Sequence, residues 1–215
     1  MNKYTIYKYL LTLSVFTLSV FTVSSQKVTY FPSFDLNSAT EVGLQLIGQL
    51  DGAYVIYRNQ PDEKAELLFC NEKGEIVKRQ TIPFIQHGIT THVNIIATPT
   101  QINFVFQDAL NNKEYLQSAV LNAKGEIAEP VRCLDSTRLD LFGPKAIYHI
   151  TSSKDKKNIL CYRIIRGFSD DQVYFNAILI DEKGKLSGNT LFYIPFNPEM
   201  ETTGTPYLTN KGEFF

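Results

Sequence analysis

The sequence contains no Trp, only three Cys and no apolar run long enough to cross a membrane. The cysteines, Cys70, Cys133 and Cys161, are too few and too widely spaced for a disulfide-dense scaffold or a zinc-binding module. Each lies in an apolar run of strand type, where a free Cys behaves as a small hydrophobic residue. A Cys133–Cys161 disulfide is the alternative. The longest apolar run, residues 10–23, falls short of the roughly 20 residues that a transmembrane helix needs.

A concentration of positive charge is also missing. The chain has 21 Lys and Arg against 22 Asp and Glu, and its formal net charge is −1. The densest group of lysines, residues 154–157, is interrupted by Asp155. Nucleic-acid binding depends on a basic surface. We therefore expect no nucleic-acid partner.

The N-terminal residues 1–25 have the composition of a secretory signal peptide. Lys3 and Lys8 supply positive charge, residues 10–23 are apolar, and the small residues Val23 and Ser25 suit a cleavage site before Gln26. An uncleaved membrane anchor is the alternative, which the short apolar run disfavours. The sequence predicts export to the periplasm, the cell surface or the medium, and a mature chain without a membrane span.

One short pattern occurs three times, at residues 69–76, 120–127 and 179–186. Each copy has an apolar run, an Asn or Asp, one variable residue, Lys-Gly, a charged residue and a further apolar residue. The glycines, Gly74, Gly125 and Gly184, are 51 and 59 residues apart. Because Asn, Asp and Gly tolerate the positive φ of tight turns, the pattern predicts three β-hairpins.

Four apolar or alternating segments accompany each of these turns, and together they predict four-stranded antiparallel units. The segments are residues 42–47, 53–58, 65–70 and 75–84, then 92–97, 102–107, 115–121 and 126–134, and finally 146–151, 158–165, 173–180 and 185–196. Pro130 and Pro195 fall in the last segment of their units, where an edge strand tolerates a missing N–H. No segment has a convincing helical periodicity, so the predicted fold class is all-β.

The predicted organisation has six parts. They are a signal peptide (1–25), an N-terminal strand segment (26–39), three units (40–86, 87–136 and 137–198) and the start of a fourth unit (199–215). The last part repeats the Lys-Gly turn at Lys211 and Gly212 and stops at Phe214 and Phe215. We therefore expect an incomplete array, and expect residues 26–215 to self-associate through the apolar face that a further unit would cover.

The spacing of the turns, the four-strand units and the recurring hairpin resemble secreted β-propeller repeat proteins over residues 40–215. The resemblance is architectural and implies blades arranged around an axis, with ligands bound by loops at one end. No named repeat family is matched. The Gly-His and Trp-Asp pairs of WD40 repeats, the Trp-containing box of sialidase-like propellers and the Gly-Gly pair of kelch repeats are all absent.

The histidines do not form a metal-binding pattern. His87 and His92 are five residues apart, whereas two ligands on one face of a strand need an even spacing, and no third ligand is near. His149 is expected to be a hydrogen-bonded strand residue rather than a catalytic base. The segment around Asp181 resembles a calcium loop only superficially, because Lys183 would repel the ion.

No nucleophile motif is present, and Ser169 beside two acidic residues has the character of a loop. A glycosidase would need two facing carboxylates, and Asp51, Asp108 and Asp140 are the only candidates at predicted strand ends. Nothing distinguishes them from solvated loop acids. Several aromatic residues near strand ends either stack on a sugar or pack between blades, and we favour packing. These are Tyr54, Tyr57, Phe104, Tyr148 and Tyr162.

The predicted function is that of an exported, non-enzymatic ligand-binding or scaffold protein whose partner is a protein or a glycan. No catalytic, cofactor-binding or metal-binding residue is assigned. The alternatives are an exported carbohydrate-active hydrolase and a structural or adhesive module of the cell surface. Fold type alone does not choose among these three.

Overall fold

The structure of the chain is a computed structural model that describes residues 43–59, 64–138, 148–166, 172–195 and 204–215. All of these residues belong to one unit of the chain, Phe31–Phe215. The predicted signal peptide and the N-terminal strand segment lie outside the described residues, so they stay predictions.

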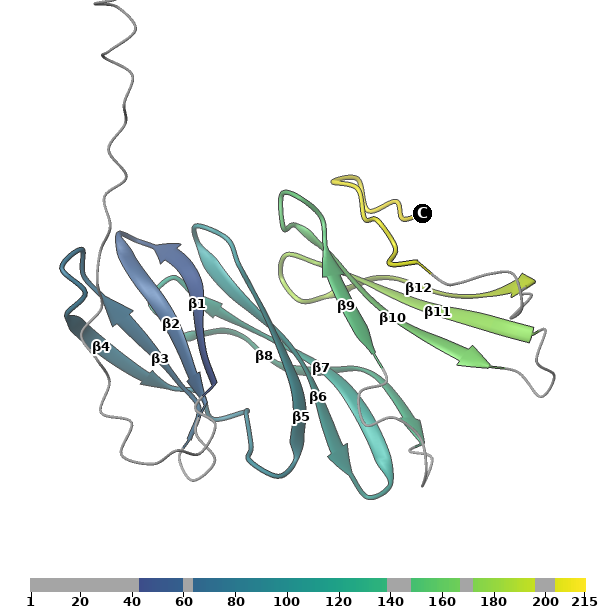
Figure 1. Ribbon diagram of the computed structural model, residues 1–215, viewed down its shortest axis with the longest axis horizontal. Coiled ribbons are helices and arrows are strands. Elements are labelled where there is room, and N and C mark those ends of the chain that lie inside the picture. The colour runs from purple at the N-terminus through teal and green to yellow at the C-terminus, as the bar shows by residue number, and fades with distance from the viewer. Residues whose placement is uncertain (1–42, 60–63, 139–147, 167–171, 196–203) are drawn as a thin grey trace, which may run out of the picture. The chain divides into compact units, whose positions relative to one another are not determined.

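The described residues form twelve β-strands and no helix, arranged as three four-stranded antiparallel sheets whose strands follow chain order (Figure 1). Sheet 1 contains β1 (Gly43–Leu50), β2 (Ala53–Asn59), β3 (Glu66–Cys70) and β4 (Ile76–Thr81). Sheet 2 contains β5 (Thr90–Ala97), β6 (Gln101–Leu110), β7 (Lys113–Asn122) and β8 (Ile127–Arg138). Sheet 3 contains β9 (His149–Ser152), β10 (Asn158–Arg166), β11 (Gln172–Asp181) and β12 (Leu186–Pro195). The all-β prediction and the three four-stranded units are confirmed.

The middle strands carry the core because both of their faces are covered. In β6, Phe104 and Phe106 pack with sheet 1, whereas Val105 belongs to a second cluster shared with sheet 3. Successive side chains of a strand point to opposite faces, so one strand serves two cores. The first core is rich in aromatic residues, and the Phe84 ring stacks 5.4 Å from that of Phe106. Strand β6 therefore has seven consecutive buried residues where a half-exposed strand would alternate.

All three cysteines are free. Cys161 is fully buried in the core between sheets 2 and 3, and burial raises the pKa of its thiol to about 12. Cys70 is likewise buried, in a cluster on sheet 1. Cys133 lies in a strand, as predicted, but its side chain is exposed on the outer strand β8 rather than packed as a small hydrophobic residue. The alternative Cys133–Cys161 disulfide is not formed.

The predicted turns are formed by one hydrogen-bond pattern. In the second turn, the N–H groups of Lys124 and Glu126 donate to Oδ1 of Asn122 at 2.9 and 3.0 Å. The N–H of Gly125 donates to the carbonyl oxygen of Asn122 at 2.8 Å, and Gly125 has a φ of +77°. Equivalent bonds to Asn71 and Asp181 form the first and third turns, and Oγ1 of Thr209 accepts them in the terminal segment.

These turns also attach one sheet to the next. A Cβ on Gly125 would lie 2.9 Å from Cζ of Phe69 in sheet 1, and one on Gly184 would lie 3.1 Å from Cγ2 of Val120 in sheet 2. Lys78 Nζ donates to the carbonyl oxygen of Lys124 at 2.7 Å, from the preceding sheet. Each turn therefore requires glycine for two reasons. The backbone has a positive φ, and a side chain of the neighbouring sheet approaches closely.

The terminal turn docks in the same way. A Cβ on Gly212 would lie 3.1 Å from Cδ2 of Leu179 in sheet 3. Asn158 Nδ2 donates to the carbonyl oxygen of Asn210 at 2.9 Å. Leu208 and Phe214 form a β-bridge with each other and pack in a hydrophobic cluster of sheet 3.

Candidate functional site

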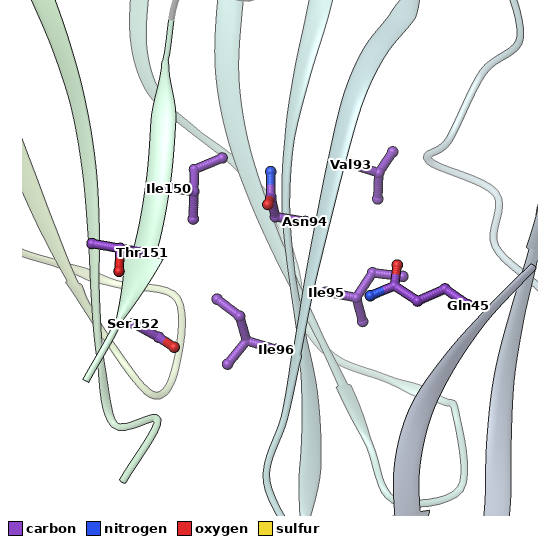
Figure 2. A pocket seen from close by; sticks show the side chains of 8 residues that line it. All are labelled: Gln45, Val93, Asn94, Ile95, Ile96, Ile150, Thr151 and Ser152. Atoms are coloured by element: carbon purple, nitrogen blue, oxygen red, sulfur yellow. The ribbon is translucent and has the colours of Figure 1, made fainter. Parts of the chain in front are cut away.

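A cavity of about 400 Å³ is lined by the first strands of the three sheets (Figure 2). We call it the inner-strand cavity. Its lining residues are Gln45 from β1, then Val93, Asn94, Ile95 and Ile96 from β5, and Ile150, Thr151 and Ser152 from β9. Pockets for small ligands have volumes of roughly 300–1,000 Å³. The cavity is therefore large enough for a ligand.

The cavity meets the edges of these strands rather than one face. Strand β5 supplies four consecutive lining residues, 93–96, although successive side chains point in opposite directions. Figure 2 shows Val93 and Ile95 on one side of β5, and Asn94 and Ile96 on the other. Strands β1, β5 and β9 are each the first strand of their sheet and pair with only one neighbour within it. Backbone N–H and C=O groups of β5 therefore face the cavity together with its side chains.

The chemistry of the lining is neutral. Gln45, Asn94, Thr151 and Ser152 supply amide and hydroxyl groups, and the other four lining residues are Val or Ile. No residue of this lining titrates near neutral pH, so it offers no general acid or base. The arrangement suits recognition by hydrogen bonds and apolar contact.

A second cavity of about 400 Å³ lies among turns of sheets 1 and 2. It is lined by Asp51, Pro99, Thr100, Asn122, Ala123, Lys124 and Glu126. Asn122 is already engaged in the turn, since its Nδ2 donates to Glu126 Oε2 at 2.9 Å. Asp51 is thus the one predicted candidate carboxylate that either cavity contains among the described residues.

The structure does not bring the candidate acids together. Asp51 shares its cavity with Thr100, directly before β6, whereas Asp108 lies seven residues beyond Gln101 in that strand. A strand rises roughly 3.3 Å per residue, so this separation is about 23 Å. Paired glycosidase carboxylates lie less than about 10 Å apart. Asp140 and Ser169 lie outside the described residues.

Asp108 is enclosed rather than accessible. Its Oδ1 accepts a hydrogen bond from Thr90 Oγ1 at 2.7 Å, and its Oδ2 accepts one from Gln117 Nε2 at 2.5 Å. Burial raises the pKa of this carboxyl, and the Thr90 hydrogen bond partly opposes the shift. These contacts tie three strands of sheet 2 together, which is a structural role.

Glu114 is the acid that sequence reasoning missed. Its side chain is 0% exposed, Oε1 accepts a hydrogen bond from Thr91 Oγ1 at 2.8 Å, and Oε2 has no hydrogen-bond partner. Burial raises the pKa of this carboxyl; the Thr91 hydrogen bond lowers it, Asp108 raises it and His92 lowers it. The preceding residues, 111–113, are polar and predict a solvated loop, so the sequence gives no signal of burial.

Polar side chains also join sheets 2 and 3. Gln107 Nε2 donates to the carbonyl oxygen of Tyr148 at 2.9 Å, and the Tyr148 N–H donates to Gln107 Oε1 at 3.0 Å. Tyr148 Oη donates to Asp135 Oδ2 at 2.8 Å, and Asn176 Nδ2 donates to the same oxygen at 3.2 Å. Burial, followed by the Asp135 contact, raises the pKa of Tyr148. This network orients the two sheets.

The histidines and aromatic residues have packing or surface positions. His87 and His92 are exposed, and no group of three His, Cys, Asp or Glu side chains in the described part of the chain forms a metal site. His149 is exposed and stacks on Tyr162, with ring centroids 5.2 Å apart. Four of the five aromatic candidates are buried, and Tyr54 packs against the sheet 1 cluster. These positions agree with packing.

No protein-family model, curated protein or solved structure matches the chain. Across the described ranges there is also no helix of the length and hydropathy that spanning a bilayer requires.

Proposed function

We propose that this chain is an exported, non-enzymatic binding protein of propeller type, and that its ligand occupies the inner-strand cavity. The observation that carries the proposal is the convergence of β1, β5 and β9 on one neutral cavity. In a propeller-type arrangement the first strands of successive blades lie nearest the axis. The turn spacing in the sequence and the position of the cavity therefore both favour a ligand that binds among the first strands of the sheets.

The hydrolase alternative has less support. A glycosidase needs a proton donor and a second carboxylate at the bond that breaks. The inner-strand cavity has neither. Asp51 lies in the cavity beside the start of β6, whereas Asp108 lies near the end of that strand. Binding without turnover is the activity that the lining residues favour.

Export is tested by the N-terminus of the mature protein. The positive residues Lys3 and Lys8, the apolar run and Ser25 predict cleavage before Gln26. N-terminal sequencing of protein from the periplasm or medium is expected to begin at Gln26 or its pyroglutamate form. Membrane-bound protein that keeps Met1 would contradict export by cleavage.

Ligand binding at the cavity is tested by filling it. We expect Ser152→Trp to weaken binding at least tenfold, because the Ser152 side chain lies on the side of β9 that faces β5 (Figure 2) and the indole would occupy space that the ligand needs. The probes are a panel of seven-residue peptides and neutral oligosaccharides, measured by titration calorimetry on the full chain. Thr190→Trp on the exposed surface of β12 is the matched control and should bind as the parent does. Equal binding by both variants would place the ligand elsewhere.

A further inference from the structure

We infer that the ligand of the inner-strand cavity is an extended, uncharged polypeptide segment that pairs with the free edge of β5 as an additional strand. The inference rests on the proposed function, since it uses the same cavity. The principal binding groups are those backbone N–H and C=O groups of residues 93–96 that point away from β6.

The regular part of β5 is suited to pairing. Residues 93–97 pair without interruption with β6, and the opposite edge of the strand has no partner in sheet 2. The register shift of this strand lies earlier, between Thr90 and His92. An uninterrupted edge offers evenly placed donors and acceptors, which is the template that an added strand requires.

The free edges of β1 and β5 also lack the charged residues that protect the outer edges of sheets 1 and 2. Strands β1 and β5 contain no Lys, Arg, Asp or Glu. The outer strands β4 and β8 contain Lys78, Arg79, Glu129 and Arg132. Charged side chains on an edge strand oppose pairing with another chain. Strand β12 is an uncharged outer strand, but a register shift opposite Leu179 and Ile180 interrupts its pairing.

The side chains beside this edge define what the peptide carries. A strand added next to β5 would place alternate residues beside Val93 and Ile95 on one face and beside Asn94 and Ile96 on the other (Figure 2). The first row favours aliphatic residues, and the second favours a mixture of amide, hydroxyl and aliphatic residues. A charged residue would lose water without gaining an ionic partner from the lining, which is unfavourable.

A peptide suits this lining better than an oligosaccharide. None of the eight lining residues is aromatic, so the cavity has no flat ring on which a sugar could stack. Backbone pairing, in contrast, needs no particular side chain on the strand and uses groups that the edge already presents.

The test uses the full chain and three sets of seven-residue peptides that alternate Val or Ile with Thr or Asn. The first set is uncharged, the second has Lys or Glu in place of Thr or Asn, and the third is the first with every internal backbone nitrogen methylated. We expect the uncharged set to bind at least tenfold more tightly than either of the others, because methylation of every internal nitrogen removes the N–H donors along both edges of the peptide. Hydrogen exchange should slow at residues 93–96 when the uncharged peptide is bound.

Each other outcome contradicts the inference in a distinguishable way. Equal binding by methylated and unmethylated peptides would show that backbone pairing is not used. Failure of every peptide, with neutral β-glucan oligosaccharides bound and protection at residues 93–96, would overturn the peptide inference and leave the proposed site in place. Peptide binding that Ser152→Trp does not change, with protection outside the cavity, would overturn both proposals.

Discussion

Replacing Gly125 by Ala is expected to lower the free energy of unfolding by about 3 kcal/mol, through a strained φ and a steric overlap. The φ of this residue is +77°, and its new Cβ would lie 2.9 Å from Cζ of Phe69. The Phe69 ring cannot move away easily, because it is 4% exposed and belongs to the core between sheets 1 and 2. Urea denaturation followed by circular dichroism measures the change.

Gly52 provides the matched control. Its φ is +80°, and a Cβ on it would meet nothing within 4 Å. Gly52→Ala should therefore cost about 1 kcal/mol, the strain of a positive φ alone. Combining Gly125→Ala with Phe69→Leu should cost less than the sum of the two single changes, since the smaller side chain makes room for the new Cβ. Equal losses for Gly125→Ala and Gly52→Ala would show that the turn does not press on sheet 1.

This pair of glycines illustrates what the sequence predicts and what it leaves out. Asn122, Lys124 and Gly125 predict the turn, because their conformational preferences are local. The contact with Phe69 is not visible in the sequence, since it joins residues in different sheets and depends on how those sheets pack. The twelve strands were also predictable from local sequence, because alternating apolar residues and turn residues mark their positions.

The candidate site was less predictable than the fold. Sequence reasoning selected acids at strand ends, such as Asp51 and Asp108, because carboxylates are the residues that chemistry most often needs. The inner-strand cavity uses neutral residues such as Asn94 and Thr151, which resemble the residues of any strand. A strand lies at the edge of a sheet when it has no neighbour on one side. Its own residues do not specify this position, because it depends on how the other strands are arranged.

Glu114→Gln is expected to stabilise the protein at pH 7.5 by about 1 kcal/mol, because it removes a buried negative charge but puts an amide NH2 group without a hydrogen-bond partner in the place of Oε2. Oε2 of Glu114 has no partner, and the side chain is fully buried. The substituted amide keeps an oxygen that accepts the Thr91 hydrogen bond and removes the negative charge. Glu213→Gln, at an exposed residue of the terminal turn, is the control and should change stability little at any pH.

The pH dependence of this gain distinguishes a lost charge from better packing. Burial raises the pKa of Glu114 in the folded protein, so the folded state binds a proton at a pH where the unfolded state does not. The parent should therefore become more stable as the pH falls through this raised pKa, and the effect should be complete below about 4.3, the ordinary pKa of Glu. Glu114→Gln lacks this contribution, so its advantage at pH 7.5 should shrink toward zero near pH 4. Asp108 remains in both proteins, but its charge interacts with that of Glu114 only in the parent, so this interaction is part of the difference between them. Denaturation curves at pH 4, 5.5 and 7.5 measure the difference. A gain of the same size at all three pH values would mean that packing, rather than the buried charge, separates the variant from the parent.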